Sequence, residues 1–265
     1  MTPEAALTKL AYVLGKSEWD LYTKKKMMGK NLRGELTVTK SSDASKSDTD
    51  MVRKLSKFLH AVEGEEYDVL KHNLLPSLYC SAACNGDLKL FKQLEARGGN
   101  FMKSTYEWKS VLHAAVASGQ VEIVRMLLSQ KVHVNVKDKH ECTPLFYATK
   151  KCNEEVIKLL RDAGGRLDMD QLSLGIELCS SVHMRNLAQL KAWKLAGADL
   201  NAYDYDSRTA LHVACSQGCR EIAKFLIESG ASINVRDVFG LTPLENAKMN
   251  NHEEVVEIFG FENSR

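Results

Sequence analysis

The sequence predicts an all-α-dominated solenoid, in which helical hairpins stack one on another. The first observation is a step of 33 residues between bulky positions, which are Tyr79, Leu112, Leu145, Leu178, Leu211 and Leu244. The second is a small residue three positions after each of them: Ala82, Ala115, Ala148, Ser181, Ala214 and Ala247. The third is a glycine typical of a helix end, at Gly98, Gly164, Gly197 and Gly230, with Lys131 as the exception. Internal repetition at such a period indicates a stacked-repeat architecture.

Composition excludes several classes of function. The chain of 265 residues carries 36 basic and 34 acidic side chains, so its net charge of +2 gives little attraction for nucleic acid or an anionic membrane. Seven cysteines without a paired framework favour a reducing compartment. The start of the chain lacks the pattern of a signal peptide, and no run of apolar residues is long enough to span a bilayer. We therefore expect a cytoplasmic protein that binds neither nucleic acid nor membrane.

The chain divides into four segments. Residues 1–37 show two short amphipathic helical patterns, too small to bury much surface alone. Residues 38–50 are small and polar, which predicts a flexible linker. Residues 51–73 are a helical lead-in, and residues 74–265 hold six repeats.

The repeats carry a recognisable motif. Residues 143–148 (TPLFYA) and 242–247 (TPLENA) resemble the T-P-L-H-x-A pattern of ankyrin repeats, and residues 209–214 and 110–115 come close to it. Each such repeat is expected to be a helix-turn-helix unit with a projecting β-turn finger. The repeat at 172–201 is degenerate, because Ile176 and Arg185 replace motif residues, but its end is intact and we count it as a full repeat. The units around Tyr79 and Gly260 are expected to cap the stack.

No catalytic constellation is evident, and we expect no catalytic residue, cofactor or metal. His113 and His212 occupy the motif histidine, where the side chain is expected to link helix and finger by hydrogen bonds. The pairs Cys80/Cys84 and Cys215/Cys219 have metal-like spacing, but they lie four repeats apart and cannot share an ion. Buried structural thiols are the favoured interpretation.

The finger tips are the best candidates for binding a protein partner, because they mix aromatic and charged side chains as interaction surfaces do. These candidates are Tyr106, Glu107, Trp108, Lys139, His140, Tyr205, Asp206, Val238 and Phe239. The alternative is that they are ordinary exposed tip residues without a partner.

The first segment shows a second resemblance. Residues 2–15 (TPEAALTKLAYVLG) and 31–37 (NLRGELT) resemble the carboxyl-terminal end of cytosolic type I L-asparaginases. A linker followed by ankyrin repeats is similar to the order in the animal asparaginase/lysophospholipase proteins. The resemblance implies hydrolysis of L-asparagine to L-aspartate and ammonia, by a nucleophilic threonine with a threonine–lysine–aspartate group and without a metal. It also implies that residues 1–37 are the two-helix remnant of an α/β domain.

The resemblance assigns no catalytic residue here. The family places its catalytic residues in T-G-G-T and G-T-D-T motifs of an amino-terminal domain, and this sequence contains neither motif. We expect a fragment of such an amidohydrolase that lacks the catalytic domain, is inactive alone, and acts as a protein-binding array. The partner would be another protein or the missing catalytic domain. The alternative is a free-standing ankyrin adaptor unrelated to asparagine hydrolysis. Oligomeric state, lysophospholipase activity and the role of the repeats in a parent enzyme stay open.

Overall fold

The computed structural model describes residues 79–96, 105–106 and 109–262. The predictions for the segments 1–37, 38–50 and 51–73 concern residues outside these ranges. The chain forms two compact units, residues 1–111 and 112–265, which are considered separately.

The first unit contributes a helical pair and a short hairpin. Residues 79–85 are helical and are followed by α5 (Leu88–Ala96). The ring of Tyr79 is buried against Phe91, with the two ring centroids 5.1 Å apart. β1 (Thr105–Tyr106) and β2 (Lys109–Ser110) pair in antiparallel fashion. The expected repeat hairpin around Tyr79 is therefore present.

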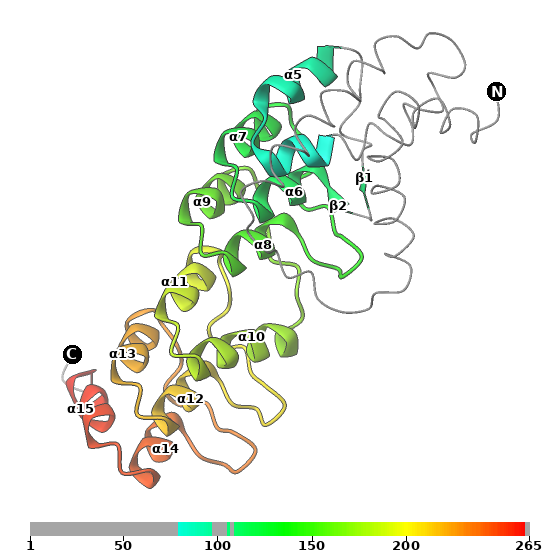
Figure 1. Cartoon of the computed structure of the whole chain (residues 1–265). Coiled ribbons are helices and arrows are strands. Elements are labelled where there is room, and N and C mark those ends of the chain that lie inside the picture. Colours follow the sequence, from blue (N-terminus) through cyan, green and yellow to red (C-terminus); the bar gives the residue numbers. More distant parts are fainter. Residues whose placement is uncertain (1–78, 97–104, 107–108, 263–265) are drawn as a thin grey trace, which may run out of the picture. The chain divides into compact units, whose positions relative to one another are not determined.

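The second unit is a stack of helical hairpins, and the solenoid prediction is confirmed. The first helices of the pairs are α6 (Val111–Ala117), α8 (Pro144–Lys150), α10 (Gln171–His183), α12 (Ala210–Ser216) and α14 (Pro243–Met249). The second helices are α7 (Val121–Ser129), α9 (Glu154–Asp162), α11 (Leu187–Leu195), α13 (Arg220–Glu228) and α15 (Glu253–Glu262). Figure 1 shows α8, α10, α12 and α14 in one row and α9, α11, α13 and α15 in another.

Local chemistry explains the helix boundaries. Thr242 caps α14 by accepting the N–H of Glu245, whose carboxylate in turn accepts the N–H of Thr242. Asn153 and Asn186 cap α9 and α11 by accepting N–H groups of their first turns. The helix-end positions at Gly164, Gly197 and Gly230 have positive φ, and Lys131 adopts the same conformation.

The repeat positions form the core, as the period predicts. Leu145, Leu178 and Leu211 are fully buried, and each such side chain contributes about 1.5–3 kcal/mol of burial free energy. Ala148, Ala214 and Ala247 are also fully buried, so their small size lets neighbouring helices approach closely. Leu244 is only partly buried, which fits its place in the last repeat.

The degenerate repeat keeps its helical pair but lacks a finger. A step of 33 residues from Pro144 would start the next first helix at Glu177, yet α10 starts at Gln171. Asp170 caps this early start, because its carboxylate accepts the N–H and the hydroxyl of Ser173, at 2.8 and 2.7 Å. The residues that would form a finger are therefore an extension of α10. Our expectation of a full repeat is wrong in this respect.

The extension of α10 packs directly on the following loop. Gly175 is buried, and a Cβ atom placed on it would lie 2.0 Å from the carbonyl oxygen of Tyr203. Only a residue without a side chain permits this approach. The close approach fixes the extension of α10 beside the next finger.

Candidate protein-binding surface

Three fingers of the second unit are built around an aspartate in the same register position. The Oδ1 atom of Asp237 accepts the N–H groups of Phe239 and Leu241, at 2.9 and 3.0 Å. Asp138 and Asp204 bind the corresponding N–H groups two and four residues further on. One carboxylate therefore organises the backbone of each finger. The degenerate repeat has Gln171 at this position, which explains why no finger forms there.

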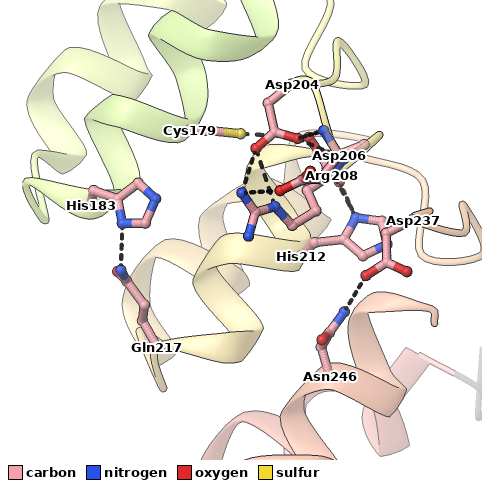
Figure 2. Close-up of polar contacts among 10 residues, drawn as sticks. Cys179, His183, Asp204, Asp206, Arg208, His212, Gln217, Asp237 and Asn246 are labelled. Atoms are coloured by element: carbon pink, nitrogen blue, oxygen red, sulfur yellow. Dashed lines mark hydrogen bonds and ion pairs between the residues drawn. The ribbon is translucent and has the colours of Figure 1, made fainter. Parts of the chain in front are cut away.

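The second oxygen of each aspartate anchors the finger to a different side chain. Tyr147 donates its hydroxyl to Asp138 at 2.5 Å, Arg208 donates to Asp204 at 3.0 Å, and Asn246 donates to Asp237 at 3.2 Å. Figure 2 shows the contacts of Asp204 and Asp237. The fingers are thus held to their own repeats and project as ordered loops.

The hydrogen bonds of the finger aspartates shift the pKa values of Asp237, Asp138 and Tyr147. Burial alone would raise the pKa of Asp237, but the N–H donors of Leu241 and Phe239 and the amide of Asn246 lower it below its usual value. The pKa of Asp138 is lowered in the same way, by Tyr147 and by two backbone donors. Burial and the neighbouring Asp138 carboxylate raise the pKa of the Tyr147 phenol. Both aspartates are therefore anionic hydrogen-bond acceptors at neutral pH.

The motif histidines link each helix to the next finger, as expected. The Nδ1 atom of His212 accepts the N–H of Thr209, and its Nε2 atom bonds the carbonyl oxygen of Leu241 at 3.2 Å. His113 bonds the carbonyl oxygen of Cys142 in the same way, at 3.1 Å. Burial lowers the pKa of His212, so the imidazole is neutral at pH 7. These histidines hold the fingers in place.

The described tip residues are exposed, as a binding surface requires. Tyr205 and Phe239 are 78% and 74% exposed, and Val238 is 57% exposed. Lys139 and His140 are exposed at the first of these fingers, and Asp206 is partly exposed beside Arg208. The backbone of Tyr106 lies in β1, whereas Glu107 and Trp108 fall outside the described residues.

The structure brings two of these fingers together and adds residues that we did not select. The N–H of Val238 donates to the carbonyl oxygen of Asp206 at 3.0 Å, so the tips carrying Tyr205 and Phe239 are neighbours. Tyr203 precedes this tip and is 46% exposed, and Ile176 of α10 follows the glycine that contacts Tyr203. We call the set Ile176, Tyr203, Tyr205, Val238 and Phe239 the aromatic surface. In the sequence, Ile176 and Glu177 stand where other repeats have Thr-Pro. This departure from the motif was the only sign that Ile176 differs from an ordinary repeat residue.

The remaining candidate chemistry is structural. Cys80, Cys215 and Cys219 are buried as expected, whereas Cys84 is exposed, so the expectation of a buried thiol is wrong at that position. Burial raises the pKa of Cys215 to about 12, so its reactive thiolate is scarce. Within the described ranges, no group of three or more His, Cys, Asp or Glu side chains is arranged to hold a metal ion. The same part of the chain contains no helix of the length and apolarity that a membrane span needs.

Comparisons with known proteins agree with this architecture. Two models of ankyrin repeats match residues 79–171 and 195–247, which together are more than half of the chain. A chain in the solved complex of a predatory endopeptidase from Bdellovibrio bacteriovorus with an immunity protein has a TM-score of 0.51. It is 21% identical, and the match covers 69% of this chain and 96% of that one, so it supports the fold alone.

Two relatives carry the similarity beyond the repeats. An L-asparaginase from Dirofilaria immitis is 39% identical over 256 residues, which is 97% of this chain and 43% of the relative. A 60 kDa lysophospholipase from Mus musculus is 35% identical over 85% of this chain and 40% of its own length. The chain thus spans less than half the length of these relatives. It belongs to the ankyrin-repeat proteins and, over most of its length, is homologous to animal L-asparaginase and 60 kDa lysophospholipase.

Proposed function

We propose that this chain is the ankyrin-bearing, carboxyl-terminal portion of an asparaginase-like amidohydrolase, and that the portion itself binds a protein and performs no catalysis. The parent reaction would convert L-asparagine and water to L-aspartate and ammonia. The similarity to L-asparaginase supports the ancestry. The lack of the T-G-G-T and G-T-D-T motifs in the sequence supports a non-catalytic role, and the same ancestry favours a cytoplasmic location.

One observation carries the binding role. Five of the seven large hydrophobic side chains that are exposed in the described part of the chain belong to the aromatic surface, and the other two are Met184 and Met249. A concentration of exposed apolar side chains on adjacent elements marks interaction sites. Tyrosine and phenylalanine also supply large contact areas at low entropic cost, because few of their torsions must be fixed. The partner is another protein or the catalytic domain of the parent enzyme.

A binding experiment tests this proposal. The wild-type chain and a Tyr205→Ser/Phe239→Ser double variant are immobilised and compared for the proteins they retain. A Met184→Ser/Met249→Ser variant is the matched control, because it removes the same number of exposed apolar side chains elsewhere. We expect a partner retained by the wild type and the control but not by the tip variant. Identical partner profiles for all three would reject the aromatic surface.

An activity assay tests the second part of the proposal, that this chain performs no catalysis. The purified chain is incubated with L-asparagine, and ammonia is measured by a coupled reduced-nicotinamide assay, with full-length Dirofilaria immitis L-asparaginase as the positive control. We expect ammonia from the full-length enzyme and none from this chain. Turnover by the chain would contradict the non-catalytic role.

A further inference from the structure

We propose, building on the binding role above, that the aromatic surface binds a second copy of this chain. The two copies are related by a twofold axis, so the same residues of each chain form both halves of the contact. Three properties of the surface support this contact. Its loops are ordered, the charges beside it are already paired within the chain, and its apolar area approaches what a dimer needs.

The two fingers that carry the aromatic surface are held in one arrangement by their backbones. Tyr203 and Thr209 form an antiparallel bridge at the base of the first finger. The N–H of Val238 donates to the carbonyl oxygen of Asp206 at 3.0 Å, which joins the first finger to the second. Figure 1 shows both fingers, the loops before α12 and α14, on the side away from α13 and α15. Side chains on an ordered backbone lose little further freedom when a partner binds.

The first finger, residues 203–209, carries three charged side chains that are paired with one another. The guanidinium group of Arg208 lies 3.0 Å from a carboxylate oxygen of Asp204 and 2.9 Å from one of Asp206. The net charge of this finger is −1. The carboxylate of Asp204 is buried and also accepts the backbone N–H groups of Asp206 and Arg208, so the excess negative charge is stabilised inside the finger.

The second finger, residues 236–242, is neutral as a whole. Its charged side chains are those of Arg236 and Asp237. Asp237 is buried, and it accepts two N–H groups of its own finger and the side-chain amide of Asn246. Arg236 pairs with Glu245 of α14 at 3.4 Å. Neither charge is therefore left for a partner to neutralise.

The pairing of these charges decides which kind of partner fits. A charged partner gains little from the two fingers, because each of their ionic groups already has a counter-ion or hydrogen-bond donors within the chain. A surface with an unpaired charge would repel its own copy, whereas an apolar surface with paired charges is complementary to itself. The whole chain has a net charge of only +2, so two copies repel each other little.

The exposed apolar area approaches what a dimer contact needs. Tyr205, Phe239 and Tyr203 are 78%, 74% and 46% exposed. An aromatic side chain buries about 150–250 Å² when it is fully covered, so these three rings offer roughly 300–500 Å². Specific interfaces begin at about 600 Å² per partner, and Val238 and Ile176 add to the area of the rings. We therefore expect a dimer of modest affinity, populated at about micromolar concentrations and above.

Sedimentation velocity of the full chain over a range of concentrations tests the inference. The wild type is compared with Tyr205→Ser/Phe239→Ser and with Met184→Ser/Met249→Ser, whose exposed methionines lie outside the aromatic surface. Circular dichroism checks that each variant is folded. Each protein is also measured in about 50 and about 500 mM sodium chloride, because salt weakens ion pairs between exposed groups but does not weaken an apolar contact.

We expect the wild type and the methionine variant to shift from the mass of one chain to that of two as the concentration rises. The concentration at half-association should rise at least about tenfold in the tip variant, because four rings leave the contact when each chain loses two. It should change less than about twofold in the methionine variant, and the higher salt concentration should not weaken the dimer. Equal association by all three proteins, or dissociation in the higher salt, would overturn the inference.

A wild-type chain that stays monomeric at every concentration would also overturn the inference, but not the binding role. The retention experiment described above separates the two. A partner retained by the wild type and the methionine variant, but not by the tip variant, would keep the binding role and assign the surface to another protein. If neither a dimer nor such a partner is found, both the inference and the binding role are wrong.

Discussion

Gly175 of α10 lies against the backbone of Tyr203, so closely that a Cβ atom would stand 2.0 Å from the Tyr203 carbonyl oxygen. This contact joins the extension of α10 to the finger that carries Tyr205. It also explains how the second unit replaces one finger by a helix without losing contact between successive repeats.

Gly175→Ala should destabilise the protein, because a methyl group cannot fit against a backbone that is itself held in a finger. We expect a loss of about 1–3 kcal/mol in the free energy of unfolding, measured by urea denaturation. Gly260→Ala is the matched control, since Gly260 is also helical but has open space around its Cβ position. It should be neutral or stabilising by up to about 1 kcal/mol. Equal effects of the two changes would argue against the close packing.

His212 should make stability depend on pH between neutrality and mild acid. Burial lowers its pKa in the folded state, so the unfolded chain binds the proton more readily. The contribution of His212 is complete above its unfolded pKa of about 6.5 and decreases as the pH falls towards the folded value. Thermal unfolding followed by circular dichroism from pH 7.5 to 5 should show the loss. His212→Gln should flatten this dependence, whereas the exposed His133→Gln should leave it as in the wild type.

Asp237→Ala should loosen one finger locally. The change removes the acceptor for the N–H groups of Phe239 and Leu241 and for the amide of Asn246, and should cost about 1–3 kcal/mol. Hydrogen exchange at the amides of Phe239 and Leu241 should accelerate. Asp206→Ala is the control, because the Asp206 side chain pairs with Arg208 at the surface instead. Since the pKa of Asp237 is lowered, the wild-type contribution should disappear as the pH falls below about 4, its ordinary unfolded value. Unchanged exchange in Asp237→Ala would contradict this role.

Core and tip substitutions should separate stability from binding. Leu211→Ala removes a fully buried side chain and should cost about 2–5 kcal/mol. Phe239→Ser removes a side chain that is 74% exposed and should change the free energy of unfolding by less than about 0.5 kcal/mol. Chemical denaturation of both variants provides the measurement. A large destabilisation by Phe239→Ser would mean that this ring packs on the protein.

The repeat period predicted the core well because burial recurs with the same register. Leu145, Leu178 and Leu211 are buried whatever the finger chemistry, since each faces the neighbouring hairpin. Gln171 stands in the sequence where three other repeats have the finger aspartate. The loss of a finger could not be inferred from it, because the role of Asp138, Asp204 and Asp237 is seen only in their hydrogen bonds. Those bonds are visible only in three dimensions. Ile176 and Tyr203 were missed for the same reason, because their proximity follows from the Gly175 contact.

Each finger is fixed by an aspartate of its own, so the residues at the tip are not needed to maintain the loop that displays them. Substitutions of Tyr205 and Phe239 should therefore leave the backbone bonds to Asp204 and Asp237 in place. On the proposed binding role, substitutions at two or three exposed tip positions would change the partner without redesign of the scaffold.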